Sequence, residues 1–333
     1  MEIVFGLDND PDASATFRSN FPKAFFLQKD LTRLRANRLR ALVSTRRKDP
    51  ILFCGCAPCQ PFSKQNANRK VEDNRIPLLS HFGRFVGYHR PEFVLIENVP
   101  GLQSISEEPG PLPAFASLLR RLDYQVAAET IDCCDYGVPQ KRRRFVLLAS
   151  NIGEIKLPQR THGSGSGLAP FSTVREWIGD LPPIEAGQAS DAVPNHRAAA
   201  LSPLNLRRIK ATPPGGGRLD WPDELTLDCH VGHTGHTDVY GRLRMDQPAS
   251  ALTTRCISLS NGRFGHPIQN RALSVREAAS LQTFDVKFRF CGTLNSMARQ
   301  IGNAVPTLLA QRLGESFLRC ANAHFSERSR GRI

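Results

Sequence analysis

The chain has 333 residues, with 44 lysines and arginines against 31 aspartates and glutamates, and a formal net charge of +13. This length suits one large domain with a smaller one. The charge favours a polyanionic partner, nucleic acid first, although a basic protein without such a partner can have the same composition. Nine cysteines are too sparse for a disulfide framework, and no apolar run reaches transmembrane length. We therefore expect a reduced, cytoplasmic protein without a signal peptide or membrane segment.

The first part of the chain alternates between short apolar runs and helical patterns. One strand ends at Asp8, and Pro11 opens the helix that follows, with Asn9 or Asp10 as its cap. The expected elements are, in order, strand 2–7, helix 11–21, strand 24–27 (ending before Asp30), helix 32–47 and strand 51–54. This alternation predicts a doubly wound α/β sheet.

Residues 55–63, Gly-Cys-Ala-Pro-Cys-Gln-Pro-Phe-Ser, follow the last of these strands. They predict a rigid loop at the carboxyl edge of the sheet, where ligands bind in parallel sheets. Cys59 could be a nucleophile, a buried structural thiol, or part of a redox or metal pair with Cys56. A zinc site needs a second ligand pair at similar spacing, which the sequence lacks, so we expect no metal. The loop by itself favours nucleophile and structural thiol equally.

Two further groups of polar residues fall at strand ends. The chain continues through loop 64–75, a helix opened by Leu78, strand 92–96, helix 113–122, strand 125–131 and strand 145–149. Glu97 ends the first of these strands, and its carboxylate is a candidate general acid or a structural cap. Alternating charge at the entry to the last strand places Arg142 and Arg144 on one face. Two guanidiniums there suit a carboxyl, a phosphate or a base oxygen, or they form a solvated basic strand end.

From residue 151 to residue 266 prolines and glycines become frequent and the strand–helix alternation stops. This change predicts a second, smaller domain of irregular, mainly β structure. Its basic residues could contact DNA phosphates or base edges, or could be plain surface. The candidates are Arg207, Arg208, Lys210, Arg218, Arg242, Arg244 and Arg255.

Two helices are expected near the end of the chain. Ser274 and Glu277 have capping-box spacing at the start of a helix over 274–283. The last helix runs from 306 to about 321 with one apolar face. That face consists of Leu308, Leu309, Leu313 and Phe317.

The stretch Pro-Cys-Gln-Pro-Phe-Ser at 58–63 resembles the catalytic loop of the cytosine-C5 DNA methyltransferases. Four further family-like blocks follow in the family's order: 97–99 (Glu-Asn-Val), 140–144 (Gln-Lys-Arg-Arg-Arg), 271–279 (Arg-Ala-Leu-Ser-Val-Arg-Glu-Ala-Ala) and 300–306 (Gln-Ile-Gly-Asn-Ala-Val-Pro). The resemblance implies a Rossmann-like sheet that uses S-adenosylmethionine. It also implies a catalytic domain over 1–155 plus 270–325, a target-recognition domain over 156–269, and a frayed tail over 326–333.

The resemblance implies a role for each matching residue. Cys59 would add to C6 of a flipped-out cytosine so that C5 can accept a methyl group, and Glu97 would act at ring N3. Arg144 would steady the base oxygen, supported by Gln140 and Arg142. For the cofactor, Asp8 would hold the ribose and Asp30 would lie near the adenine amino group. The rest of that pocket would include Leu78, Asn303 and Val305.

The sequence departs from the family at its start. The family begins with a strand and a Phe-x-Gly-x-Gly loop around the methionine part of the cofactor, whereas Met1 here leads directly into the second strand. We expect about one βα unit, roughly 20–30 residues, to be absent, which leaves a gap between strands 2–7 and 51–54.

Four functions are therefore considered. The first is an active DNA cytosine methyltransferase in a restriction-modification or other DNA-marking role, and the second is an impaired DNA-binding remnant. The third is an RNA cytosine-C5 methyltransferase, and the fourth is a Cys-x-x-Cys redox protein. The expected partner is double-stranded DNA. A restriction endonuclease would be a functional partner, and the protein would be a monomer associated with the nucleoid.

Overall fold

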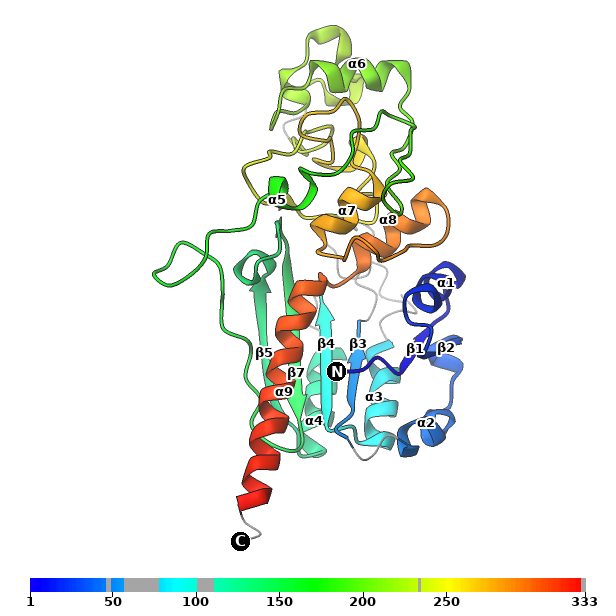
Figure 1. Ribbon diagram of the computed structural model, residues 1–333, viewed down its shortest axis with the longest axis vertical. Helices are drawn as coiled ribbons and strands as arrows, with labels where there is room; N and C mark the ends of the chain where they lie inside the picture. The colour runs from blue at the N-terminus through cyan, green and yellow to red at the C-terminus, as the bar shows by residue number, and fades with distance from the viewer. Residues whose placement is uncertain (46–48, 57–77, 101–110, 233–234, 331–333) are drawn as a thin grey trace.

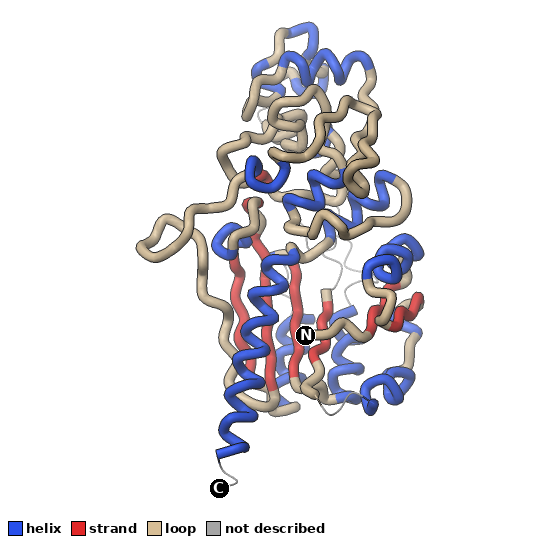
Figure 2. The backbone as a smooth tube through the Cα atoms, viewed as in Figure 1, coloured by secondary structure: helices blue, strands red, loops and turns tan. Residues whose placement is uncertain are grey.

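The structure is a computed structural model that describes residues 1–45, 49–56, 78–100, 111–232 and 235–330. Two parts follow one another along the longest axis (Figure 1). The sheet unit carries the main strands, and the second unit consists of loops and short helices (Figure 2). No helix in the described ranges is both long and apolar enough to cross a membrane.

The strands of the sheet unit form two separate sheets, one parallel and one mixed. The first pairs β1 (Phe5–Asp8) with β2 (Phe25–Gln28) in parallel. The second has the order β3-β4-β7-β5, in which β3 is parallel to β4 and β7 is antiparallel to both of its neighbours. Its strands are β3 (Leu52–Gly55), β4 (Phe93–Asn98), β5 (Gln125–Asp132) and β7 (Arg143–Ser150). The predicted α/β sheet is confirmed, and among the described residues no strand joins β1 to β3, where the sequence predicted a gap.

Helices cover both faces of the four-stranded sheet because its central strand alternates strictly. Phe93 and Leu95 of β4 face α9 (Thr307–Arg330), where Leu309, Leu313 and Phe317 are fully buried. The intervening Val94 and Ile96 face α3 (Leu78–His89) and α4 (Pro111–Arg121). The predicted apolar face of the last helix is therefore confirmed. The helix extends to Arg330, so the frayed tail predicted from residue 326 is wrong.

Local capping signals in the sequence are confirmed. The Asp10 carboxylate accepts the N–H groups of Asp12 and Ala13 at the start of α1 (Pro11–Asn20). Ser274 and Glu277 form the reciprocal capping box of α7 (Val275–Leu281). Both motifs satisfy amide groups that the first turn of a helix leaves without a partner.

The predicted basic helix over 32–47 is wrong. The segment instead forms two 3-10 turns, η1 (Leu31–Arg33) and η2 (Ala36–Leu39), and the short helix α2 (Arg40–Thr45). Side chains of α3 take its carbonyl groups: Arg84 donates to Leu31, Thr32 and Leu34, and His89 contacts the Ala36 carbonyl at 2.8 Å. These bonds replace the intrahelical ladder that a continuous helix would need.

The second unit is irregular, as predicted, but the expectation of mainly β structure is wrong. Its described part contains α5 (Val174–Ile178), α6 (Pro203–Ala211) and several 3-10 turns, whereas its ladder pairing consists of β8 (Ala249–Ser250) on β6 (Gln140–Lys141) and a few isolated bridges. Buried side chains satisfy the loop backbone instead. Arg242 alone donates to five oxygens, those of Thr212, His266, Gln269, Ile209 and the Asn270 side chain.

The boundary between the units also differs from the sequence-based one. α7 and α8 (Leu294–Asn303) pack in the core of the second unit, among Val174, Leu252 and Phe264, and not against the sheet. α9 is the segment after residue 270 that returns to the sheet core. The segment that holds α7 and α8 thus contributes to the core of the second unit, and residues 289–299 also contact α1 of the sheet unit.

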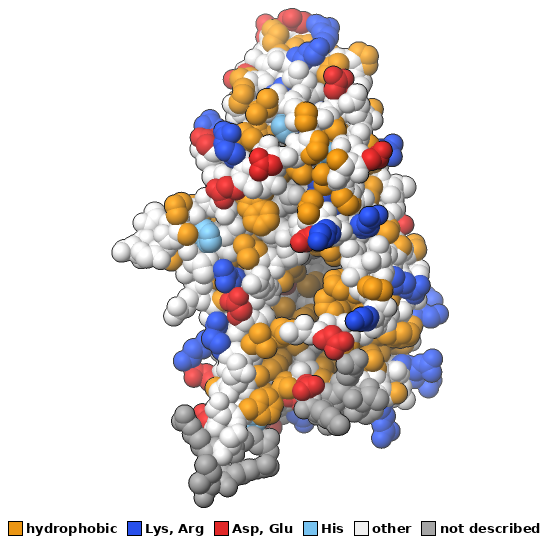
Figure 3. All heavy atoms as spheres, in the orientation of Figure 1, with side chains coloured by type: hydrophobic (Ala, Val, Ile, Leu, Met, Phe, Trp, Pro, Cys, Tyr) orange, Lys and Arg blue, Asp and Glu red, His pale blue; other side chains and the backbone are white. Residues whose placement is uncertain are grey.

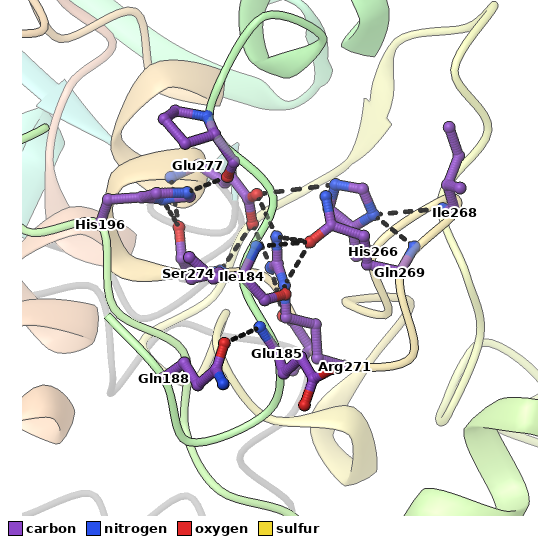
Figure 4. Close-up of polar contacts among 12 residues, drawn as sticks. Ile184, Glu185, Gln188, His196, His266, Ile268, Gln269, Arg271, Ser274 and Glu277 are labelled. Carbon is purple, nitrogen blue, oxygen red and sulfur yellow. Dashed lines mark hydrogen bonds and ion pairs between the residues drawn. The ribbon is translucent and has the colours of Figure 1, made fainter. Parts of the chain in front are cut away.

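A fully buried ion pair anchors α7 to the loops of the second unit (Figure 4). Arg271 donates to both carboxylate oxygens of Glu277 at 2.7 Å and also to Gln269 and Ile184. Burial raises the pKa of Glu277, but hydrogen bonds and charge from Arg271 outweigh it, so the pKa is lowered overall. His266 completes the cluster at 3.6 Å from the same carboxylate.

Candidate active site

The candidate site lies at the carboxyl ends of β3 and β4. Gly55 is in register with Ile96, so the chain leaves β3 for Cys56 beside the point where β4 reaches Glu97. The Glu97 amide donates a hydrogen bond to Cys56. Cys59 itself lies outside the described residues. It follows Cys56 by three positions, so its segment starts from this edge of the sheet.

An ion pair between Glu97 and Arg144 defines the described part of the site. Arg144 Nε lies 2.8 Å from Glu97 Oε1, and the two side chains are 13% and 6% exposed. The pairing of β4 with β7 sets this geometry, because Glu97 is opposite Val146 and Arg144 is two residues earlier on the same strand. The structure therefore brings together two residues that are 47 positions apart in the sequence.

The surroundings of Glu97 shift the pKa of its carboxyl group upward, which makes it a better proton donor than an exposed carboxylate. Burial raises the pKa of Glu97, while the charges of Arg144 and then Arg142 act in the opposite direction, and the net shift is upward. A carboxylic acid next to a fixed guanidinium offers a hydrogen-bond donor and a positive charge at one place. That combination suits a heterocycle that accumulates negative charge while it reacts.

Arg142 and Gln140 have a different position from Arg144. Arg142 lies between β6 and β7, is 2% exposed, and donates to the carbonyls of Leu252 and Gly302 at 2.7 and 2.8 Å. Gln140 is fully buried; it accepts from the Leu252 amide and donates to the side chain of Gln282. Both side chains join the sheet unit to the second unit. Arg142 falls between the two strands and bonds to the second unit, whereas Arg144 lies on β7 and pairs with Glu97, although the charges of both arginines act on Glu97.

The two acidic residues expected at the cofactor lie at the ends of neighbouring strands. Asp8 ends β1, is exposed, and accepts the Asp10 amide with one carboxylate oxygen. Asp30 follows β2 and caps η1, accepting the amide and hydroxyl of Thr32, and these hydrogen bonds lower the pKa of Asp30. Exposed carboxylates at this edge fit the hydroxyl and amino donors of a nucleoside. In the described residues, β1 runs directly into α1 without a glycine turn, so no described group fits the methionine end.

The remaining cofactor candidates lie on other elements. Leu78 is half-buried at the first turn of α3, Asn303 is exposed at the end of α8, and Val305 packs at the edge of the α9 core. α8 is held against the start of α1, because Arg299 forms a 2.6 Å ion pair with Asp10. Sequence reasoning missed this contact, since nothing local connects residues 289 positions apart.

The basic candidates of the second unit fall into two groups. Arg208, Arg218 and Arg242 are buried and use their guanidiniums on carbonyl groups or aromatic rings. Those remaining are exposed and stay candidates for DNA contacts: Arg207, Lys210, Arg244 and Arg255. Burial therefore removes three of the seven candidates.

The arrangement is that of an α/β unit whose candidate site lies at the carboxyl edge of the sheet, next to a loop-rich second unit. Residues 1–319 match the family described as C-5 cytosine-specific DNA methylase. Type II methylase M.HgiDII of Herpetosiphon aurantiacus is 36% identical over 337 residues, covering 99% of this chain and 92% of the relative. Type II methyltransferase M1.HphI of Haemophilus parahaemolyticus is 33% identical, covering 95% and 80%.

Solved structures show the same fold. A DNA modification methyltransferase encoded within an E. coli prophage superposes with a TM-score of 0.67 at 24% identity, covering 96% of this chain and 93% of the other. The S. pombe Dnmt2 methyltransferase superposes with a TM-score of 0.60 at 17% identity, covering 94% and 89%. The chain therefore belongs to the C-5 cytosine-specific DNA methylase family. It is a DNA (cytosine-5)-methyltransferase whose methyl donor is S-adenosylmethionine.

Proposed function

We propose that this chain methylates C5 of a cytosine flipped out of duplex DNA, with Cys59, Glu97 and Arg144 at the base. The observation that carries the proposal is the buried Glu97–Arg144 ion pair at the edge where β3 leads toward Cys59. This edge offers an acid and a cation to a base, and the sequence that follows β3 supplies a thiol at Cys59.

Each residue has a defined task in this proposal. The Cys59 thiolate adds to C6 of cytosine and forms a C–S bond, and Glu97 donates its proton toward N3 as the ring becomes electron-rich. Arg144 holds Glu97 in place and steadies the base oxygen. Bound S-adenosylmethionine supplies the methyl group. Loss of the C5 proton to water, with return of the N3 proton to Glu97, then expels the Cys59 thiolate and restores the ring.

Gln140 and Arg142 act as positioning residues in this proposal. Their side chains hold the entry to β7 against Leu252, Gly302 and Gln282, so they fix the strand that carries Arg144. Asp8 and Asp30 would hold the nucleoside half of the cofactor, with Leu78, Asn303 and Val305 around it.

Bisulfite sequencing of plasmid DNA from cells expressing the chain tests the proposal. We expect protected cytosines at one recurring short site, and their complete loss in Cys59→Ala. Protection that persists in Cys59→Ala would refute the covalent mechanism. If no cytosine is protected, the alternative of a catalytically impaired DNA-binding protein would be favoured.

We further propose a role in a restriction-modification system, in the cytoplasm, as a monomer on the nucleoid. Two relatives are named as type II methylases or methyltransferases, which supports a functional partnership with a restriction endonuclease. The RNA alternative is supported by the fold alone and is tested by the same bisulfite reading on tRNA. If tRNA is methylated and the plasmid is not, the RNA function would replace the proposed DNA function.

A further inference from the structure

The segment that was expected to be a helix presents a row of basic side chains, which we call the basic strip. It consists of Lys29, Arg33, Arg35, Arg38 and Arg40, and all five are exposed. The sequence contains no acidic residue from 31 to 48. Figure 3 shows lysines and arginines along the same edge of the molecule, over the region that Figure 1 labels α1, β2 and α2.

The backbone of the basic strip is firmly held. In the segment 29–40, which carries the basic strip, apolar residues alternate with the arginines and face inward. There Leu34 and Leu39 pack with Phe85 of α3. Arg84 donates to three backbone carbonyls of this segment, and His89 contacts a fourth. The guanidiniums therefore project outward from a fixed scaffold, so ordering them against a partner costs less conformational entropy than ordering a loose loop.

The charges of the basic strip are not neutralised within the described part of the chain. No described carboxylate lies within ion-pair distance of its four guanidiniums. Asp30, the nearest acid in sequence, accepts the amide and hydroxyl of Thr32 and feels the charge of Arg33 without forming a close ion pair with it. A rigid row of uncompensated arginines is suited to phosphate groups, which Arg binds with paired N–H donors.

The position of the strip relates it to the candidate site. The Lys29 amide donates to the Asp8 carbonyl, so the strip starts at the carboxyl edge of β1 and β2. It then runs along α3, whose first residue, Leu78, follows the segment that contains Cys59. Arg84, which holds the start of the strip, is six residues into that helix, an axial distance of about 9 Å. The strip therefore leads away from the site along the outer edge of the sheet unit.

We propose that the basic strip is a second, sequence-independent contact for duplex DNA, binding phosphates that flank the target site. The proposal rests on DNA being the substrate and adds a surface outside the second unit and outside the site at Glu97 and Arg144. Each neutralised phosphate contributes about 0.9 to the slope of log K against log salt concentration. A strip contact requires DNA that extends beyond the target, so its contribution depends on duplex length.

The test compares two double variants that remove the same charge. Arg38→Gln/Arg40→Gln alters the strip, whereas Arg120→Gln/Arg121→Gln alters two exposed arginines at the end of α4. Binding of random-sequence duplexes of about 12 and about 36 base pairs is measured by fluorescence anisotropy over a range of KCl concentrations. Circular dichroism of both variants confirms that each is folded.

We expect the strip variant to lower the salt slope by about 1–2 on the long duplex and to leave the short duplex unchanged, while the α4 variant retains the wild-type slope. Equal losses in both variants, or a loss on the short duplex alone, would overturn the proposal. If the strip variant loses tRNA binding but not duplex binding, the strip is an RNA surface and the proposal is wrong. These readouts need no methyl transfer, so failure of the proposed function remains distinguishable.

Discussion

Arg142 and Arg144 show how two residues of one type, two positions apart, take different tasks. Arg142 uses its guanidinium on backbone carbonyls of the second unit, whereas Arg144 pairs with Glu97 at the strand edge. The motif in the sequence predicts both as a group, because residue types carry no information about which distant groups each side chain will reach. Burial and partners separate them, so substitutions at the two positions should have different signatures.

Arg144→Ala should reduce methyl transfer by roughly 10²–10³, since it removes a preorganised charge beside the base. Without the guanidinium the pKa of Glu97 should rise further, because burial is then less opposed. The acid form of Glu97 would persist to higher pH, so the alkaline limb of the residual activity should move upward. Single-turnover transfer rates across a pH series, on a duplex with the site found by bisulfite sequencing, measure both effects.

Arg143→Ala provides the matched control. Arg143 is the exposed neighbour on the same strand, and its substitution removes the same charge. Its rate and pH profile should stay close to the wild type. Arg144→Lys should restore part of the rate, as a point charge without the planar fork. A pH profile unchanged in Arg144→Ala would contradict the pairing of the two groups in catalysis.

At the scale of elements, patterns predicted strands and capped helices well and predicted the connecting segments poorly. The capping box at Ser274 is a local signal and appears as expected. Residues 31–45 have helical propensity but do not form one continuous helix, because Arg84 and His89 of α3 bond to their carbonyl groups. In the second unit, buried Arg242 and Arg271 replace ladder bonds with side-chain bonds. Hydrogen bonds of this kind, between segments distant in the sequence, cannot be predicted from local patterns.

The cluster at α7 predicts a pH dependence of stability. The amides of Ile268 and Gln269 donate to His266 Nδ1, so the neutral ring carries its proton on Nε2, facing Glu277. Burial lowers the pKa of His266 from 6.5 to about 4. Between these values the unfolded chain binds a proton that the folded chain does not, so stability should fall on acidification, by roughly 3 kcal/mol in all.

His266→Asn separates this effect from the titration of other groups. The asparagine side-chain oxygen can accept the same amides but does not titrate. Urea unfolding at a series of pH values should show the wild type losing stability relative to the variant from pH 6.5 down to 4, with a constant difference above that window. Parallel curves throughout would show that His266 does not carry the dependence.

At the scale of the whole molecule, the sequence predicted the family and the α/β sheet. It could not predict that α7 and α8 belong to the core of the second unit, since that depends on apolar contacts between distant segments. It also gave no sign that α8 is tied to α1 through Arg299 and Asp10. Long-range packing thus determines where the two units meet, whereas the local sequence determines which side chains lie at each strand end.

The divided sheet has a consequence for motion. Among the described residues no ladder bond connects β1 to β3, so the segment from β1 to β2 can open without breaking the four-stranded sheet. Its attachments are the apolar cluster around Phe85 and the contacts of α1 with α8. We expect it to be a separate cooperative unit, with amides in β2 exchanging hydrogen for deuterium about 10²-fold faster than those in β7.

Hydrogen exchange followed by mass spectrometry measures this difference, and equal protection of β2 and β7 would exclude it. Asp8 lies on the segment that opens and Asp30 directly follows it, whereas Leu78 and Val305 lie outside it, so a nucleoside held by both sides would bind the closed form alone. Ligand affinity would then include the free energy of closing the segment. S-adenosylhomocysteine should therefore slow exchange across residues 5–28 and leave exchange in β7 unchanged.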